Sequence, residues 1–83
     1  MPRVKDLSPE TTAKNQFSNY LRGEAHIVYR GMPGFADAVG LSQSTIRRRV
    51  SDPREFSVNE LRRVRKSLGV DKAEIMKFLE AVI

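Results

Sequence analysis

The chain has 83 residues, carries a net charge of +5 at pH 7 and contains no cysteine. This length supports one small domain, and the absence of cysteine excludes disulfides, thiolate nucleophiles and zinc sites built from sulfur. No apolar run approaches the ~18 residues that cross a bilayer, and the first ten residues lack the apolar stretch of a signal peptide, so we expect a soluble, intracellular protein.

The first helix is predicted over roughly residues 11 to 30, after a flexible arm at residues 1 to 10. Ser8 before Pro9 resembles a helix start, but the apolar pattern becomes regular only further on, and Gly31 is expected to end the helix in a left-handed conformation. The positions that recur at helical spacing are Phe17, Tyr20, Leu21, Glu24, Ile27 and Val28.

The second helix is predicted from about Pro33 to Val39. Proline suits a first turn because its missing N–H has no partner there. Gly40 ends the helix. The inward-facing residues are expected to be Phe35, Ala36 and Val39.

The third helix is predicted from Gln43 to about Ser51, with Ser42 as its N-cap. Asp52 before Pro53 ends it, because a residue that precedes proline is pushed out of the α region. Its buried side is Ile46 and Val50. At 100° per residue, the residues nearly opposite are Ser44, Arg48 and Ser51, with Arg47 to one side and Arg49 to the other.

Two predicted capping boxes mark the starts of the last two helices. With these helices, the chain is predicted to be all-α. Ser57 and Glu60 form a capping box, and a second box is expected at Asp71 and Glu74, opening a C-terminal helix over about residues 72 to 82. Gly69 ends the fourth helix. The apolar residues of the two helices are Leu61, Val64 and Leu68, then Ile75, Phe78, Leu79 and Val82.

The basic residues are concentrated between Arg47 and Lys66, where eight basic and three acidic residues leave a net charge of +5. The rest of the chain has seven of each sign. Such a cluster indicates an anionic partner, with nucleic acid ahead of a membrane surface. A solvated helix face that is basic for solubility is the alternative.

The second and third predicted helices together indicate a helix-turn-helix over about residues 33 to 51. Ala36 is small enough to allow close approach, and Gly40 can take the positive φ that the turn requires. Leu41 and Ile46 fill the angle between the helices.

The stretch from about Tyr20 to Val70 resembles the phage repressor and Cro family of helix-turn-helix proteins. "GMPGFADAVGLSQSTIRRRV" and "FSVNELRRVRKSLGV" carry the resemblance, which covers about 50 of 83 residues. The family usually has an aliphatic residue at the position of Arg49, whereas here it falls at Val50, and Pro33 stands where many relatives offer a polar side chain to phosphate.

The resemblance implies a compact five-helix lambda-repressor-like domain over residues 11 to 83. It also implies a sequence-specific regulator of transcription that binds double-stranded DNA, as a phage or prophage repressor does when it occupies an operator as a dimer. The expected location is a bacterial cytoplasm or nucleoid. Arg3 and Lys5 either follow the DNA as an arm or are simply disordered.

Candidate DNA contacts follow from the predicted placement of the third helix. Glutamine suits adenine and arginine suits guanine, and the start of a recognition helix inserts deepest into the major groove. The predicted base contacts are Gln43, Ser44, Arg47 and Arg48. The predicted phosphate contacts are Ser42, Thr45, Arg49, Arg54, Arg62 and the backbone N–H of Gly34.

A homodimer is expected because one recognition helix reads only a few base pairs. The last helix ends on more apolar surface than a solvated terminus requires. Core packing explains Phe78 and Leu79 equally well. The candidate interface residues are Phe78, Leu79, Val82 and Ile83.

No catalytic residue, metal ligand, cofactor, small-molecule ligand or membrane partner is predicted. The sequence has no evident pair of groups for nucleophilic or acid–base chemistry, and His26 has no second metal ligand nearby. The alternative function is a protein-interaction module or an antitoxin-like regulatory subunit that uses the fold as a scaffold. Such a protein would bind duplex DNA weakly and without a steep dependence on salt.

Overall fold

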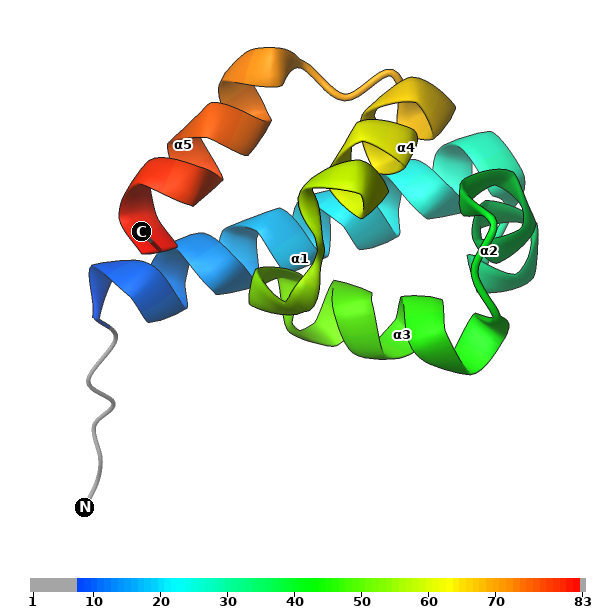
Figure 1. The fold of residues 1–83 in the computed structure, drawn as a ribbon, viewed down its shortest axis with the longest axis horizontal. Coiled ribbons are helices and arrows are strands. Elements are labelled where there is room, and N and C mark those ends of the chain that lie inside the picture. The colour runs from blue at the N-terminus through cyan, green and yellow to red at the C-terminus, as the bar shows by residue number, and fades with distance from the viewer. Residues whose placement is uncertain (1–7, 83) are drawn as a thin grey trace.

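The computed structural model describes residues 8–82, and within them every regular element is helical (Figure 1). The all-α prediction is therefore confirmed for this part of the chain. The sequence analysis missed a single 3₁₀ turn, η1. The elements are α1 (Pro9–Tyr29), α2 (Met32–Val39), α3 (Gln43–Ser51), η1 (Pro53–Glu55), α4 (Val58–Leu68) and α5 (Lys72–Val82).

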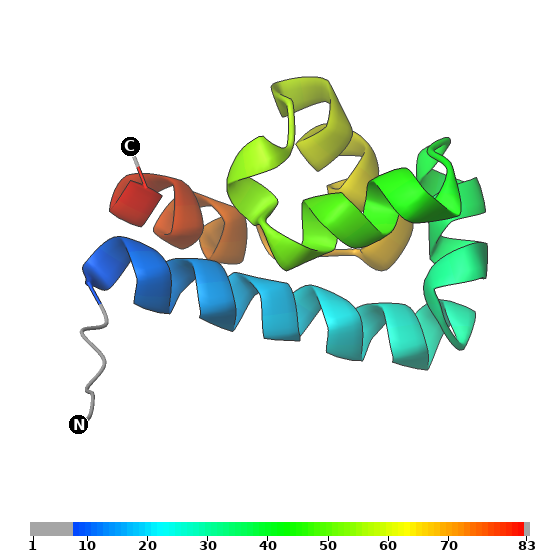
Figure 2. The ribbon, with the colours of Figure 1, turned by 90° about the horizontal axis from the view of Figure 1, so that it is seen from below.

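α1 is a long helix against which the other helices of residues 8–82 pack (Figures 1 and 2). Its start is earlier than predicted. The Ser8 hydroxyl accepts a hydrogen bond from the Thr11 N–H at 3.2 Å, and Pro9 occupies the first turn. Pro9 and Glu10 therefore belong to the helix and not to the predicted arm; residues 1–7, including Arg3 and Lys5, lie outside the described residues.

The C-terminal end of α1 also differs from the prediction. The left-handed residue is Arg30, with φ of 60°, in place of Gly31. The buried row of α1 continues from Leu21 to Ala25 and on to the half-buried Tyr29. Because this row advances four residues at a time, Ile27 and Val28 fall outside it and are 73% and 46% exposed.

The apolar core has two parts, one between α1 and α5 and the other among α2, α3 and α4. α5 lies along the N-terminal half of α1, where the rings of Phe17 and Phe78 stack with centroids 4.6 Å apart. α2, α3 and α4 enclose the other part of the core. The fully buried residues there include Phe35, Val39, Ile46, Val50 and Val64.

The predicted capping box at the start of α4 is confirmed. The Ser57 hydroxyl accepts from the Glu60 N–H at 3.1 Å, and Glu60 Oε1 accepts from the Ser57 N–H at 3.0 Å. At α5 only half of the predicted box is seen among the described residues, because Asp71 accepts from the Ala73 N–H and no bond returns from Glu74. Both helices nevertheless begin within one residue of the predicted position.

Candidate nucleic-acid interface

The predicted helix-turn-helix segment corresponds to α2, α3 and the connection between them. Gly40 has φ of 82°, and its N–H and that of Leu41 both donate to the Ala36 carbonyl oxygen, at 2.9 and 3.0 Å. The Ser42 hydroxyl then accepts from the Thr45 N–H at 3.2 Å and begins α3. Figures 1 and 2 show that the chain turns steeply here, so that α3 runs across one face of the molecule.

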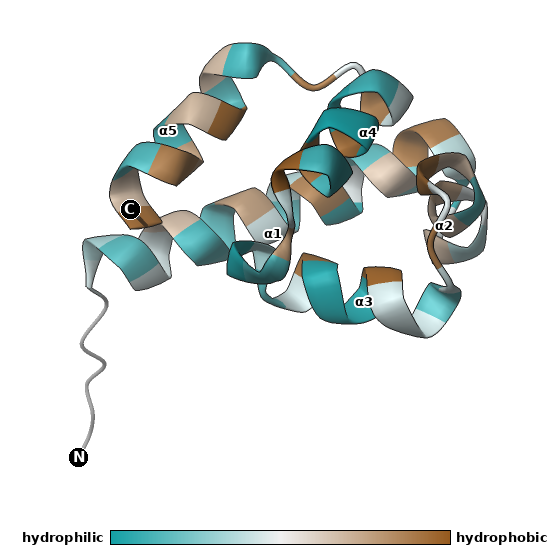
Figure 3. Cartoon of the chain, in the orientation of Figure 1, coloured by the Kyte–Doolittle hydropathy of each residue, from teal (hydrophilic) through white to brown (hydrophobic). Residues whose placement is uncertain are grey.

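α3 is fixed by a narrow apolar side. Ile46 and Val50 are buried, as predicted, and the apolar rim of α3 faces the interior in Figure 3 while its outer surface is polar. This placement leaves the opposite side in solvent. All four predicted base contacts are exposed: Gln43, Ser44, Arg47 and Arg48.

Arg49 lies on the flank of α3 and contacts α4. Its Nε donates to Glu60 Oε1 at 3.1 Å, and the two side chains are only 23% and 16% exposed. The backbone N–H of Ser57, and after it the guanidinium of Arg49, lower the pKa of the Glu60 carboxyl below its ordinary value. Arg49 thus has a structural role that the sequence analysis missed, and its predicted phosphate contact stays a prediction.

Arg54 is similarly engaged, in η1. Its guanidinium donates to both carboxylate oxygens of Asp52, at 2.8 and 3.0 Å, and to Glu10 Oε2 at 2.6 Å. These hydrogen bonds raise the pKa of Arg54, and the bonds from Arg54 are the main cause of the lowered pKa of Asp52. Arg54 therefore ties η1 to the first turn of α1, with two carboxylates balancing its charge.

The remaining predicted phosphate contacts lie at the starts of α2 and α3 and on the surface of α4. The hydroxyls of Ser42 and Thr45 bond to each other at 2.8 Å, and Arg62 is exposed on α4. Gly34 lets α2 approach α1 closely, because a Cβ at this position would lie 3.2 Å from the Tyr29 carbonyl oxygen. α2 begins at Met32, and its N-cap residue, Gly31, provides no capping hydrogen bond from a side chain.

A hollow of about 430 Å³ lies beside the exposed edge of α3. Arg22 and His26 enter it from α1, and Arg22 Nη2 donates to Ser51 Oγ at 3.4 Å. The spacing of these two residues places them on one face of α1, but the sequence does not reveal which helix lies opposite. The lining residues are Arg22, His26, Gly31, Met32, Arg47, Val50 and Ser51.

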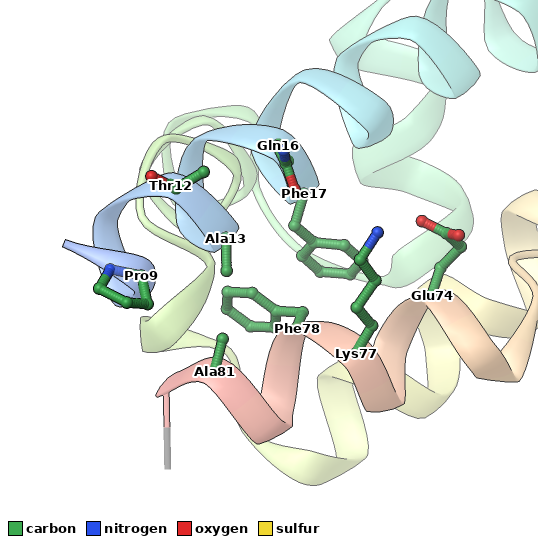
Figure 4. Close-up of a pocket in the computed structure, with 9 residues that line it drawn as sticks. All are labelled: Pro9, Thr12, Ala13, Gln16, Phe17, Glu74, Lys77, Phe78 and Ala81. Carbon is green, nitrogen blue, oxygen red and sulfur yellow. The ribbon is translucent and has the colours of Figure 1, made fainter. Parts of the chain in front are cut away.

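The candidate interface residues are mostly part of the core. Phe78 is 3% exposed and stacks on Phe17 at the floor of an open groove between α1 and α5, shown in Figure 4. Its ring has almost no surface left for a second chain, which corrects its assignment to an interface. Leu79 and Val82 are half-buried against the core, and Ile83 lies outside the described residues.

Within residues 8–82 no three potential metal ligands lie together, and no helix is long and apolar enough to cross a membrane. Comparison with models of protein families, with curated proteins and with solved structures found no match.

Proposed function

We propose that this chain is a sequence-specific regulator of transcription that binds double-stranded DNA through α3. One observation carries the proposal: α3 buries Ile46 and Val50 and leaves a polar and basic edge in solvent, next to a tight turn after α2. In this proposal α2 and α3 form a helix-turn-helix of the lambda-repressor type, and α3 enters the major groove.

The exposed edge of α3 carries the groups that base recognition needs. Gln43 and Ser44 stand in its first turn, the end that reaches deepest into the groove, and Arg48 follows one turn later. The Gln43 amide matches the donor and acceptor of adenine, and the Arg48 guanidinium matches the two acceptors of guanine. Arg47 lies at the margin of this edge, where it also lines the hollow beside α1.

Electrostatics support an anionic partner. The ion pairs among the described residues involve Arg49 and Arg54, whereas Arg47 and Arg48 have no carboxylate within 4 Å there. Their charges are therefore available to a ligand. Double-stranded DNA supplies a dense row of negative charges on both sides of the major groove.

The proposal includes a homodimer on an operator whose half-sites lie about one DNA turn apart, in a bacterial cytoplasm or nucleoid. Occupancy of the operator would repress transcription by blocking polymerase, as in a phage or prophage repressor. A single α3 contacts too few base pairs for useful specificity, and a pair of them doubles the site. Leu79, Val82 and Ile83 remain the proposed interface residues.

The test is selection of bound duplexes from a random pool, followed by titration of the selected duplex and a scrambled one. We expect a palindromic consensus and an affinity that falls steeply with salt. Arg48→Ala should weaken binding to the selected duplex by about 1–3 kcal/mol. Its loss of affinity for the scrambled duplex should be much smaller. Lys72→Ala, at the start of α5 on the edge opposite α3, removes the same charge as a control (Figure 1).

No enrichment from the pool, together with weak binding that hardly depends on salt, would contradict the proposal. That result would favour the protein-interaction module. Equal losses on both duplexes for Arg48→Ala would show that DNA is bound without base recognition by this edge.

A further inference from the structure

The hollow between α1, the start of α2 and α3 is basic, and no role has been assigned to it. Arg22 and His26 line it from α1, and Arg47 and Ser51 line it from α3. None of the residues that line it is acidic. The charged side chains that line it are therefore all basic, and the Ser51 hydroxyl beside them accepts from Arg22.

The charge at the hollow is uncompensated. Arg49 and Arg54 each pair with a carboxylate, but Arg22 and Arg47 form no ion pair among residues 8–82. Two guanidinium groups from separate helices at one concave surface raise the local positive potential, which favours an anion there. The start of α2, which lacks a capping side chain, adds the positive end of a helix to the same wall.

We propose that this hollow binds one backbone phosphate of the DNA, an inference that rests on the DNA-binding function proposed above. Arg22 and Arg47 donate to the phosphate oxygens, for which the planar guanidinium group is well matched. His26 donates a further hydrogen bond from a ring N–H. This assigns Arg47 to the DNA backbone, in place of the base contact expected from the sequence.

The position of the hollow favours a phosphate over a base. It lies on the flank of α3, against α1, whereas Ser44 and Arg48 lie on the face turned away from Ile46 and Val50. When α3 occupies the major groove, the strands that border the groove pass along the flanks of the helix. A phosphate contact there fixes how far α3 enters the groove and carries no sequence information.

The first test measures affinity against salt for Arg22→Gln on the selected and the scrambled duplex. We expect binding to both duplexes to weaken by about tenfold and the slope of log K against log salt to shrink by about 0.9. Arg22→Lys should restore most of the slope, because it keeps the charge. Lys72→Gln should leave both values close to those of the unsubstituted chain.

Ser51→Ala separates phosphate binding from a structural role, because it removes the 3.4 Å contact with Arg22 and no charge. We expect Ser51→Ala to keep the slope of the unsubstituted chain. If Ser51→Ala reproduces the loss seen with Arg22→Gln, Arg22 acts by positioning α3, and the proposal is overturned.

A second test replaces single phosphates of the selected duplex by neutral methylphosphonates. One position in each half-site should weaken binding of the unsubstituted chain and weaken binding of Arg22→Gln clearly less, because the variant has already lost one of the two guanidinium partners of that phosphate. Unchanged affinity and slope in Arg22→Gln would overturn the assignment while leaving DNA binding intact. Failure of the unsubstituted chain to bind any duplex would instead remove the proposed function.

Discussion

The α1–α5 pair and the region of α2, α3 and α4 both bury apolar side chains, but they differ in the polar contacts that accompany that burial. Two stacked rings, Phe17 and Phe78, lie at the centre of the first. The second region also has an apolar core, which includes Phe35, Ile46 and Val64, and it adds polar contacts and a left-handed Gly40 at the helix ends. A nine-residue helix such as α3 has little intrinsic stability, so its orientation depends on the burial of Ile46 and Val50 and on the contacts at its ends.

The largest effect should come from removing apolar contact between α1 and α5. Phe78→Ala leaves a cavity against Phe17 and should lower the free energy of unfolding by about 3–5 kcal/mol, measured by urea denaturation. Met76→Ala is the matched control on the same helix, because Met76 is 47% exposed and should change the value by about 0.5 kcal/mol or less. Equal effects of the two substitutions would mean that α5 does not pack as described.

A smaller effect is expected in the turn before α3. Gly40→Ala should lower the free energy of unfolding by about 1–2 kcal/mol, because φ of 82° is unfavourable for alanine. Space is not the reason, since the nearest atom to an added Cβ, Arg63 Nη1, lies at 3.5 Å. Gly23→Ala, inside α1 with nothing within 4 Å, should stabilise the chain by about 0.5–1 kcal/mol. If thermal unfolding shows that both substitutions raise the melting temperature, or that both lower it, the assigned conformation of Gly40 is contradicted.

The smallest effect should be a dependence of stability on pH that arises in the second region. The pKa of Glu60 is lowered in the folded chain, so the unfolded chain binds more protons in mild acid. The stabilisation from Glu60 is present above its unfolded pKa of about 4.3 and is lost as the pH falls through its lower folded pKa. Denaturation measured from pH 7 to pH 3 should show this loss.

Two substitutions identify the source of that dependence. Glu60→Gln should flatten the decline in stability with acid, and Arg49→Gln should flatten it less, because the Ser57 N–H is the larger cause of the lowered pKa. The decline that remains is assigned in part to Asp52, whose pKa is lowered by Arg54. An unchanged pH profile in Glu60→Gln would show that its carboxyl titrates alike in both states.

The helices could be predicted from the sequence because their ends carry local signals. Ser42 and Ser57 cap α3 and α4 as expected, and the spacing of Ile46 and Val50 correctly identifies the buried side of α3. Ile27 also recurs at helical spacing, but it is 73% exposed. Periodicity alone does not reveal where the neighbouring elements stop covering a helix.

The contacts around the candidate site could be predicted only in part. The exposed edge of α3 follows from its helical period. Arg49 and Glu60 are 11 residues apart and Arg54 and Glu10 are 44 apart, so no local pattern relates them. The basic hollow likewise needs three helices to be placed in space before Arg22 faces Arg47.

One oxygen atom, Glu60 Oε1, accepts hydrogen bonds both from the Ser57 N–H and from Arg49 Nε. Fraying of the first turn of α4 therefore also disturbs the ion pair on the flank of α3, whereas Ile46 and Val50 stay buried in the core. We expect the two helix ends to be coupled through this one atom. A partner that seats α3 firmly thereby also protects the backbone amides at the start of α4, although it need not touch them.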